Sequence, residues 1–139
     1  MGLVLDSSVL IAAERGRFAL TTTTDAMAEE PVVLSAITAS ELLHGVYRAA
    51  DLARRLQRER FVEAILARFP ILEFGLETAR IHARLWAELA ASGQRIGAHD
   101  LLIAATAMEL DFKVATLDYR DFPRIPGLRL HNWGEAHSI

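Results

Sequence analysis

Short apolar runs alternate along the chain with longer stretches in which apolar residues recur at helical spacing. The short runs have the length of buried strands, and they cover residues 2–5, 32–36, 71–74, 112–117 and 128–131. The longer stretches predict helices, and they cover residues 9–13, 38–47, 51–69, 77–91 and 96–108, with a further short helix expected within residues 18–30. This alternation favours an α/β fold, with a central parallel sheet of four to five strands flanked by helices. No internal repeat or linker divides the sequence, so we expect a single domain over residues 1–139.

Two of the predicted helices carry broad apolar stripes. In the helix over residues 51–69 the stripe consists of Leu52, Leu56, Val62, Ile65 and Leu66. In the helix over residues 77–91 it consists of Ile81, Leu85, Trp86 and Leu89. Core packing is the ordinary role of such stripes, and a subunit interface is the alternative in so small a domain. The polar face of the first helix is rich in Arg, which fits a solvated face with ion pairs and leaves RNA contact as an alternative.

The helix predicted over residues 96–108 is apolar on nearly every side, which is typical of a buried helix. Asp100 lies at its head. A carboxylate at that place has to be paired, hydrogen-bonded or coordinated, because leaving it bare in a low dielectric costs several kcal/mol. The simpler interpretation is that Asp100 only complements the positive end of the helix dipole.

Other acids follow predicted strands in the same way. Asp6 ends the first strand, Glu41 follows the second, and Asp118 and Asp121 follow the strand over residues 112–117. In an open parallel sheet the carboxyl ends of the strands share one edge, which is where ligands bind. Simpler roles exist here too: Asp6 fits a helix N-cap, and Glu41 fits a capping box with Thr38.

Several acids at one sheet edge repel one another, and a bound divalent metal is an ordinary remedy. Carboxylate oxygens select Mg²⁺ or Mn²⁺, and zinc is disfavoured because His99 is the only nitrogen or sulfur ligand in the cluster. Such a site suits the hydrolysis of phosphodiester bonds, in which metal activates water and stabilises the charge on phosphate.

Composition narrows the class of protein further. The absence of Cys excludes a thiolate metal site and a disulfide framework, and no apolar run is long enough to cross a membrane, so we expect a cytoplasmic protein. The net charge of −3 argues mildly against a nucleic-acid binder. That argument weakens if four acids hold metal, because the rest of the chain is then slightly basic.

Three segments resemble the motifs of the PIN-domain nucleases and, among these, of the VapC-type ribonuclease toxins of bacterial toxin–antitoxin pairs. They are Val4-Leu5-Asp6-Ser7-Ser8-Val9-Leu10-Ile11, Ser35-Ala36-Ile37-Thr38-Ala39-Ser40-Glu41-Leu42-Leu43-His44-Gly45 and Ala98-His99-Asp100-Leu101-Leu102-Ile103-Ala104-Ala105-Thr106-Ala107. Their order and spacing extend the resemblance over almost the whole chain, and it implies a PIN-like fold.

The resemblance implies a catalytic and metal-binding set formed by Asp6, Glu41, Asp100 and Asp118. It also implies one or two Mg²⁺ or Mn²⁺ ions as cofactor, and supporting roles for Ser7, Ser8, Thr116 and Asp121. Relatives often have Asn at the position of Asp118, in a Thr-x-Asn-x-x-Asp-Phe pattern, so whether Asp118 or Asp121 is the fourth acid stays open. Relatives also commonly have a Gly before the strand, where this chain has Glu109-Leu110-Asp111-Phe112. The implied partners are an RNA substrate, a cognate antitoxin protein and a second copy in a homodimer.

The expected function is therefore that of a metal-dependent endoribonuclease and toxin that cleaves structured RNA. A phosphoryl-accepting signalling domain fits poorly, because Ser7 and Ser8 follow Asp6 where such domains have paired acids, and Lys113 begins a strand instead of ending one. A Gly-rich phosphate loop with Lys is also missing. The alternative left open is a module with the same fold that acts on DNA, or only binds a partner without catalysis.

Overall fold

The computed structural model describes residues 1–17 and 30–133. The short helix predicted within residues 18–30 falls on residues outside this description. Four strands form one parallel sheet in the order β3-β2-β1-β4. Their bounds are Leu3–Leu5 for β1, Val32–Ser35 for β2, Ile71–Leu72 for β3 and Lys113–Ala115 for β4. The predicted α/β class with a parallel sheet is confirmed.

The fifth predicted strand, over residues 128–131, is reduced to one isolated parallel bridge between Val114 and Leu130. Two backbone hydrogen bonds support the bridge, from Val114 N–H to the Arg129 carbonyl and from His131 N–H to the Val114 carbonyl. Pro123, Pro126 and Gly127 precede the segment, and Gly127 has a positive φ. The chain therefore touches the sheet edge but does not extend along it.

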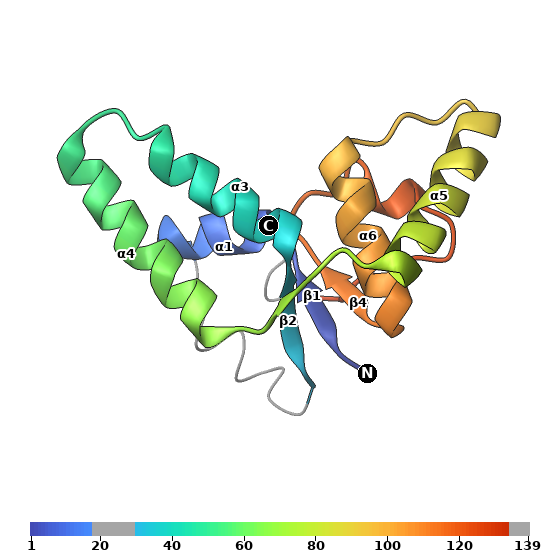
Figure 1. Ribbon diagram of the computed structural model, residues 1–139, viewed down its shortest axis with the longest axis horizontal. Helices are drawn as coiled ribbons and strands as arrows, with labels where there is room; N and C mark the ends of the chain where they lie inside the picture. Colours follow the sequence, from blue (N-terminus) through green and yellow to red (C-terminus); the bar gives the residue numbers. More distant parts are fainter. Residues whose placement is uncertain (18–29, 134–139) are drawn as a thin grey trace.

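Helices cover the sheet and diverge from it as two arms (Figure 1). The α-helices span Ser7–Glu14 (α1), Ala36–Tyr47 (α3), Leu52–Arg68 (α4), Leu76–Ala91 (α5) and Ala98–Leu110 (α6), and a 3₁₀ helix, η1, spans Phe122–Arg124. One arm is the hairpin of α3 and α4, with α1 beside it, and the other is the pair of α5 and α6. Within the described residues, no helix is both long and apolar enough to cross a membrane.

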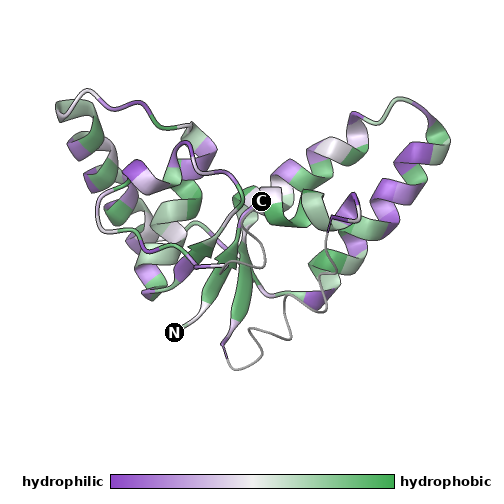
Figure 2. Cartoon of the chain, turned by 180° about the vertical axis from the view of Figure 1, so that it is seen from behind, coloured by the Kyte–Doolittle hydropathy of each residue, from purple (hydrophilic) through white to green (hydrophobic). Residues whose placement is uncertain are grey.

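Each face of the sheet has its own hydrophobic core. Side chains alternate between the faces of a strand, so Val4 of β1 joins the core under α5 and α6, while its neighbour Leu5 joins the core under α3 and α4. Val114 and Ala115 of β4 divide in the same way. The middle of the sheet is apolar, as Figure 2 shows, because both of its faces are covered, and polar residues stand only at strand ends, such as Ser35 and Lys113.

Helix α6 is buried as predicted, with six of its side chains in the core. It ends at Asp111, which takes the left-handed conformation with φ 58°. Gly adopts that conformation without strain, and Asp is one of the few other residues that does so readily. The turn that precedes β4 is therefore kept although this segment lacks the Gly that is common in relatives.

The two apolar stripes are only partly buried. Leu52 is 70% exposed and Leu56 48% exposed, so the prediction that they point into the core is wrong. The first turns of α4 extend past the core that holds Val62 and Ile65. Trp86 on α5 is likewise 64% exposed, although Leu85 and Leu89 are buried. These side chains form apolar surface outside the folded core.

Candidate active site

The candidate site lies where β1 and β4 end side by side. Asp6 follows β1 directly, and its N–H donates a hydrogen bond to the carbonyl of Ala115, the last residue of β4. Thr116 and Asp118 come next after β4. The parallel register of the two strands therefore brings together residues that are more than a hundred positions apart in sequence.

Hydroxyl groups hold the buried Asp6 carboxylate, which is only 4% exposed. Ser8 Oγ donates to Asp6 Oδ2 over 2.7 Å, and Thr116 Oγ1 donates to the same oxygen over 2.9 Å. The two hydroxyls lie 3.2 Å apart, and each also accepts a backbone N–H, from Leu117 to Ser8 and from Asp118 to Thr116. Asp6 occupies the N-cap position of α1, but its side chain makes no capping hydrogen bond there, so the simple capping role is wrong.

Glu41 lies in the second turn of α3, which begins two residues earlier than predicted. Ser35 caps the helix by accepting the N–H of Ile37 over 3.1 Å. Thr38 is therefore inside the helix, and the capping box of Thr38 with Glu41 does not form. Glu41 Oε2 instead lies 3.6 Å from Nδ1 of His99, and the Ser7 hydroxyl also bonds to the Glu41 carboxylate. Burial and the charge of Asp6 raise the pKa of Glu41 above its ordinary value.

Asp100 lies in the first turn of α6, three residues after the N-cap Gly97. Burial raises its pKa to about 7, and a hydrogen bond with Asp121 together with the charges of Asp6, Asp121 and Asp118 adds to the shift. An acid that served only the helix dipole would have a lowered pKa. Burial and the neighbouring acids therefore outweigh any effect of the helix dipole on Asp100.

Asp118 and Asp121 have different surroundings. Asp118 Oδ1 accepts the N–H of Arg120 over 3.1 Å and lies 3.4 Å from Arg120 Nε. The Arg120 side chain is 88% exposed. Asp121 Oδ2 accepts the N–H of Gly97 over 3.0 Å, and Asp121 Oδ1 accepts Arg124 Nη2 over 2.7 Å. The Gly97 N–H is the main cause that lowers the pKa of Asp121. Both acids lie close enough to Asp100 to raise its pKa.

A family model described as PIN domain matches residues 3–128. The chain belongs to the PIN-domain family. It is 38% identical over 131 residues to a protein named Ribonuclease VapC from Rickettsia bellii, an alignment that covers 94% of this chain and 95% of the relative. It is 33% identical over 100 residues to a protein named tRNA(fMet)-specific endonuclease VapC from Salmonella typhimurium, which covers 72% of this chain and 74% of the relative.

Solved structures agree with this assignment. The crystal structure of VapBC2 from Rickettsia felis bound to a DNA fragment from its promoter contains a chain that superposes with a TM-score of 0.86 and 27% identity, covering 96% of this PIN domain and 99% of that chain. The resemblance to PIN-domain nucleases of the VapC type, expected from the three motifs, is confirmed.

The acids of this PIN domain fit a divalent cation by their chemistry. The candidate ligand atoms of the four acids are all carboxylate oxygens, which Mg²⁺ and Mn²⁺ prefer. Glu41 Oε1 is buried and has no hydrogen-bond partner in the structure, and such an atom gains from a cation. Burial, together with repulsion from neighbouring acids, raises the pKa of Asp100 and of Glu41, and a cation would relieve both effects. In residues 1–17 and 30–133, however, no three His, Cys, Asp or Glu side chains stand together in a ready-made cation geometry. The carboxylates would have to turn toward a bound ion.

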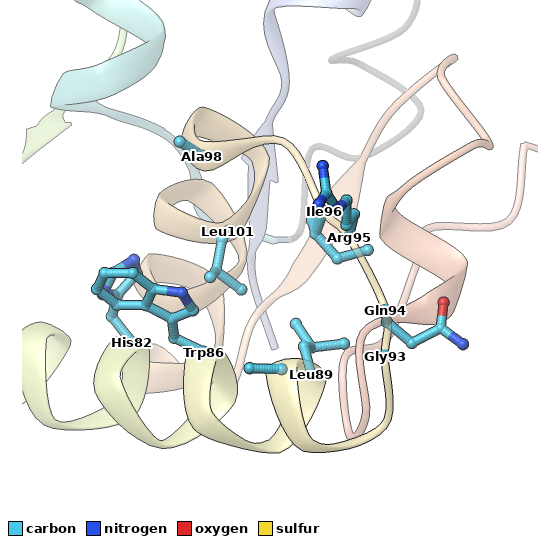
Figure 3. A pocket seen from close by; sticks show the side chains of 10 residues that line it. His82, Trp86, Leu89, Gly93, Gln94, Arg95, Ile96, Ala98 and Leu101 are labelled. Carbon is cyan, nitrogen blue, oxygen red and sulfur yellow. The ribbon is translucent and has the colours of Figure 1, made fainter.

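Beside the acids, but without any of them in its lining, lies an open apolar hollow of about 500 Å³ (Figure 3). It is bounded by α5, the connection to α6 and the first turn of α6, and lined by His82, Trp86, Leu89, Ala90, Gly93, Gln94, Arg95, Ile96, Ala98 and Leu101. The ring of His82 lies 5.7 Å from that of Trp86 and 5.8 Å from that of Phe74. His82 is therefore a half-buried side chain within an aromatic cluster.

Three contacts of the PIN-domain site were not predicted from the sequence. His99 contacts Glu41, the Gly97 N–H holds Asp121, and Arg124 pairs with Asp121. The spacing of Asp121 and Arg124 by three residues is a weak signal of the last pair, because it is common in solvated turns. The other two contacts join segments that are far apart in sequence, so no local pattern reveals them.

Proposed function

We propose that this chain is a metal-dependent endoribonuclease and the toxin of a toxin–antitoxin pair, acting as one PIN domain over residues 1–139. The main support is electrostatic. Asp6, Glu41, Asp100 and Asp118 come from four separate segments. Burial is the main cause that raises the pKa of Asp100 to about 7, and the charges of Asp6 and Asp118 add to the shift, while burial and the charge of Asp6 raise the pKa of Glu41. Buried acids of like charge are costly to stability, and holding a cation is the role that compensates them. The VapC ribonucleases among the relatives support the same activity.

In the proposed site Asp6 and Asp100 are the principal ligands of Mg²⁺ or Mn²⁺, and Glu41 and Asp118 complete the set. When bound, the cation supplies activation of water and neutralises the charge that builds on the scissile phosphate. Ser8 and Thr116 fix the Asp6 carboxylate through their hydroxyls, and Ser7 together with His99 orients Glu41. Asp100 has to lose its proton before it can bind the cation.

The proposed activity is tested by RNA cleavage with the purified chain, in Mn²⁺ and in a chelator. Cleavage should occur in Mn²⁺, stop in the chelator, and disappear in Asp6→Asn and Asp100→Asn. Asp111→Asn is a matched control, because it removes the same charge at the far end of α6, where Asp111 is exposed. Undiminished cleavage by both active-site variants would contradict the proposal.

We further propose two protein partners. Antitoxin binding is supported by the VapBC complexes among the structural neighbours. A homodimer is supported by exposed apolar side chains on α5 and just before it, Phe74, Leu76 and Trp86, of which Trp86 lines the hollow. A cytoplasmic location is part of the same proposal, since an RNA substrate and an antitoxin would be found there.

The alternative is a PIN-fold module that acts on DNA, or only binds a partner without catalysis. The observation in its favour is the promoter DNA in the Rickettsia felis VapBC2 structure. Cleavage of single-stranded DNA instead of RNA, or Mn²⁺ binding without cleavage of either, would favour this alternative.

A further inference from the structure

We propose that Arg124 is a positioning residue of the site: through Asp121 it fixes the start of α6, and with it Asp100. The inference rests on the proposed function, because it takes Asp100 as a cation ligand. It also assigns the two acids whose roles the sequence left open, with Asp121 as support for Asp100 and Asp118 as the fourth ligand.

Arg124 joins two segments that carry the site. Its Nη1 donates to Gln94 Oε1 over 2.9 Å and its Nη2 to the Arg95 carbonyl over 2.8 Å, both in the connection between α5 and α6. On its own segment, Nη2 donates to Asp121 over 2.7 Å and Nε to the Arg120 carbonyl over 3.1 Å. One guanidinium therefore ties the segment after β4 to the chain that leads directly into α6.

Asp121 completes the connection from Arg124 to Asp100. Its Oδ1 accepts Arg124, and its Oδ2 accepts the N–H of Gly97, the N-cap of α6. Asp100 bonds to the same carboxylate. The crowding around Gly97 shows how close these groups are, because a Cβ there would lie 3.2 Å from Asp121 Oδ2 and 3.5 Å from Asp100 Oδ2.

These contacts distinguish Asp121 from Asp118. Both oxygens of Asp121 are held by donors from the fold, a backbone N–H and a guanidinium that makes three further hydrogen bonds. The hydrogen bonds to the Asp118 carboxylate among the described residues reach only Oδ1, from the backbone N–H of Arg120 and from the Arg120 side chain, which is 88% exposed and can swing away at little cost. Asp118 is therefore the acid that can turn toward a cation, whereas Asp121 stays in place and keeps Asp100 oriented. Groups that orient a ligand in this way usually change metal affinity by about 10- to 100-fold.

The test compares Arg124→Ala with Arg129→Ala. The two arginines have similar exposure, 41% and 46%, and each pairs with an Asp next to one end of α6, Arg124 at the start and Arg129 at the end. In the metal-free protein, hydrogen exchange of the Gly97 and Leu101 amides, which donate to Asp121 Oδ2 and to the Gly97 carbonyl, should be at least about tenfold faster in Arg124→Ala and unchanged in Arg129→Ala. Mn²⁺ affinity should fall about tenfold in Arg124→Ala alone, and RNA cleavage should show a lower kcat at unchanged KM.

Two further variants distinguish positioning from a general loss of structure. Arg124→Lys keeps a cation for Asp121 but loses the fork to residues 94 and 95, so it should recover part of the Mn²⁺ affinity. In an Asp121→Asn background, Arg124→Ala should cost less than it does alone, because the residue through which it acts is already altered. Fully additive effects would overturn the proposal.

Unchanged exchange at the start of α6 in Arg124→Ala would also overturn the proposal, and so would equal losses of Mn²⁺ affinity in Arg124→Ala and Arg129→Ala. Failure of the proposed function looks different. In that case the unaltered protein neither binds Mn²⁺ nor cleaves RNA, while the exchange measurement still reports whether Arg124 fixes the start of α6.

Discussion

Asp6 and Asp100 stand at the same sheet edge but are stabilised in different ways. Asp6 is buried and receives two hydroxyl donors on one oxygen, from Ser8 and Thr116. Asp100 bonds instead to another acid, and its pKa is raised to about 7. Hydrogen bonds to a carboxylate stabilise its charge, whereas burial next to other acids destabilises it. The fold thus supplies hydrogen bonds to the carboxylate of Asp6, whereas it destabilises the charged form of Asp100. A bound cation would relieve that destabilisation.

The largest expected effect is the loss of RNA cleavage when either Asp6 or Asp100 is replaced. Asp6→Asn and Asp100→Asn should each reduce RNA cleavage by more than about 100-fold, since removal of a ligand costs more than removal of a group that only orients one. Initial rates at saturating Mn²⁺ measure this effect. Near-normal cleavage by one of the two variants would show that only the other side of the site is catalytic.

The pH dependence of Mn²⁺ binding should report Asp100. Because its pKa is raised to about 7, the carboxyl is protonated below that pH and the cation has to displace the proton. Apparent affinity should therefore fall about tenfold per pH unit below about 7, and level off above it. Asp121→Asn removes a group that raises the pKa of Asp100, so it should move the midpoint to lower pH. Affinity that stays constant from pH 5 to 8 would contradict the assigned role of Asp100.

Thr116→Val should lower the free energy of unfolding, because it weakens the support of the Asp6 carboxylate. The variant removes one of the two hydroxyl donors to a buried carboxylate without changing the size of the side chain, which costs about 1–3 kcal/mol of unfolding free energy. Urea denaturation of the metal-free protein measures it. Thr106→Val is a control, because the Thr106 hydroxyl bonds only to the carbonyl of Leu102 within α6.

In contrast to Thr116→Val, Asp100→Asn should stabilise the metal-free protein. An acid with a raised pKa in the folded state favours folding most at low pH, and that contribution is lost as pH rises from about 4 to about 7. At pH 8 the neutral Asn removes the repulsion from Asp6, Asp118 and Asp121, so the melting temperature should rise. At pH 4 the two proteins should melt at similar temperatures. A lower melting temperature of the variant at pH 8 would show that the fold does not destabilise the charged form of Asp100.

The smallest effect is expected at the ends of the arms. Leu56→Ser should change stability by no more than about 0.5 kcal/mol, because Leu56 is 48% exposed on α4. Leu85→Ala, in the core under α5, should cost about 2–5 kcal/mol. Similar losses in both variants would mean that the tip of the α3–α4 arm is packed against something in solution.

The pattern of the sequence was sufficient for the sheet and for the acids beside it. Buried strands are apolar on both faces, and the acid that follows such a strand lies at the sheet edge whichever helix comes next. Asp6 and Asp118 could be placed for that reason, and Asp100 could be placed because its helix is apolar all round.

Contacts between residues that are far apart in the sequence could not be predicted from these patterns. Periodicity could not show that α4 extends past its core, so Leu52 and Leu56 were taken as buried. A capping pattern at Thr38 hid the true cap, Ser35, because both residues suit the role and only the path of β2 decides between them. The support of Asp100 by Gly97, Asp121 and Arg124 depends on how two loops meet.

Calorimetric titration of Mn²⁺ into the metal-free protein at pH 8, beside Asp100→Asn, tests the central claim most directly, because it needs no knowledge of the RNA. The account predicts saturable binding to the unaltered protein that is lost in the variant, with protons released when the titration is repeated at pH 6.5. Equal binding by both proteins would place the cation elsewhere. No binding by the unaltered protein would contradict the claim that its acids form a cation site.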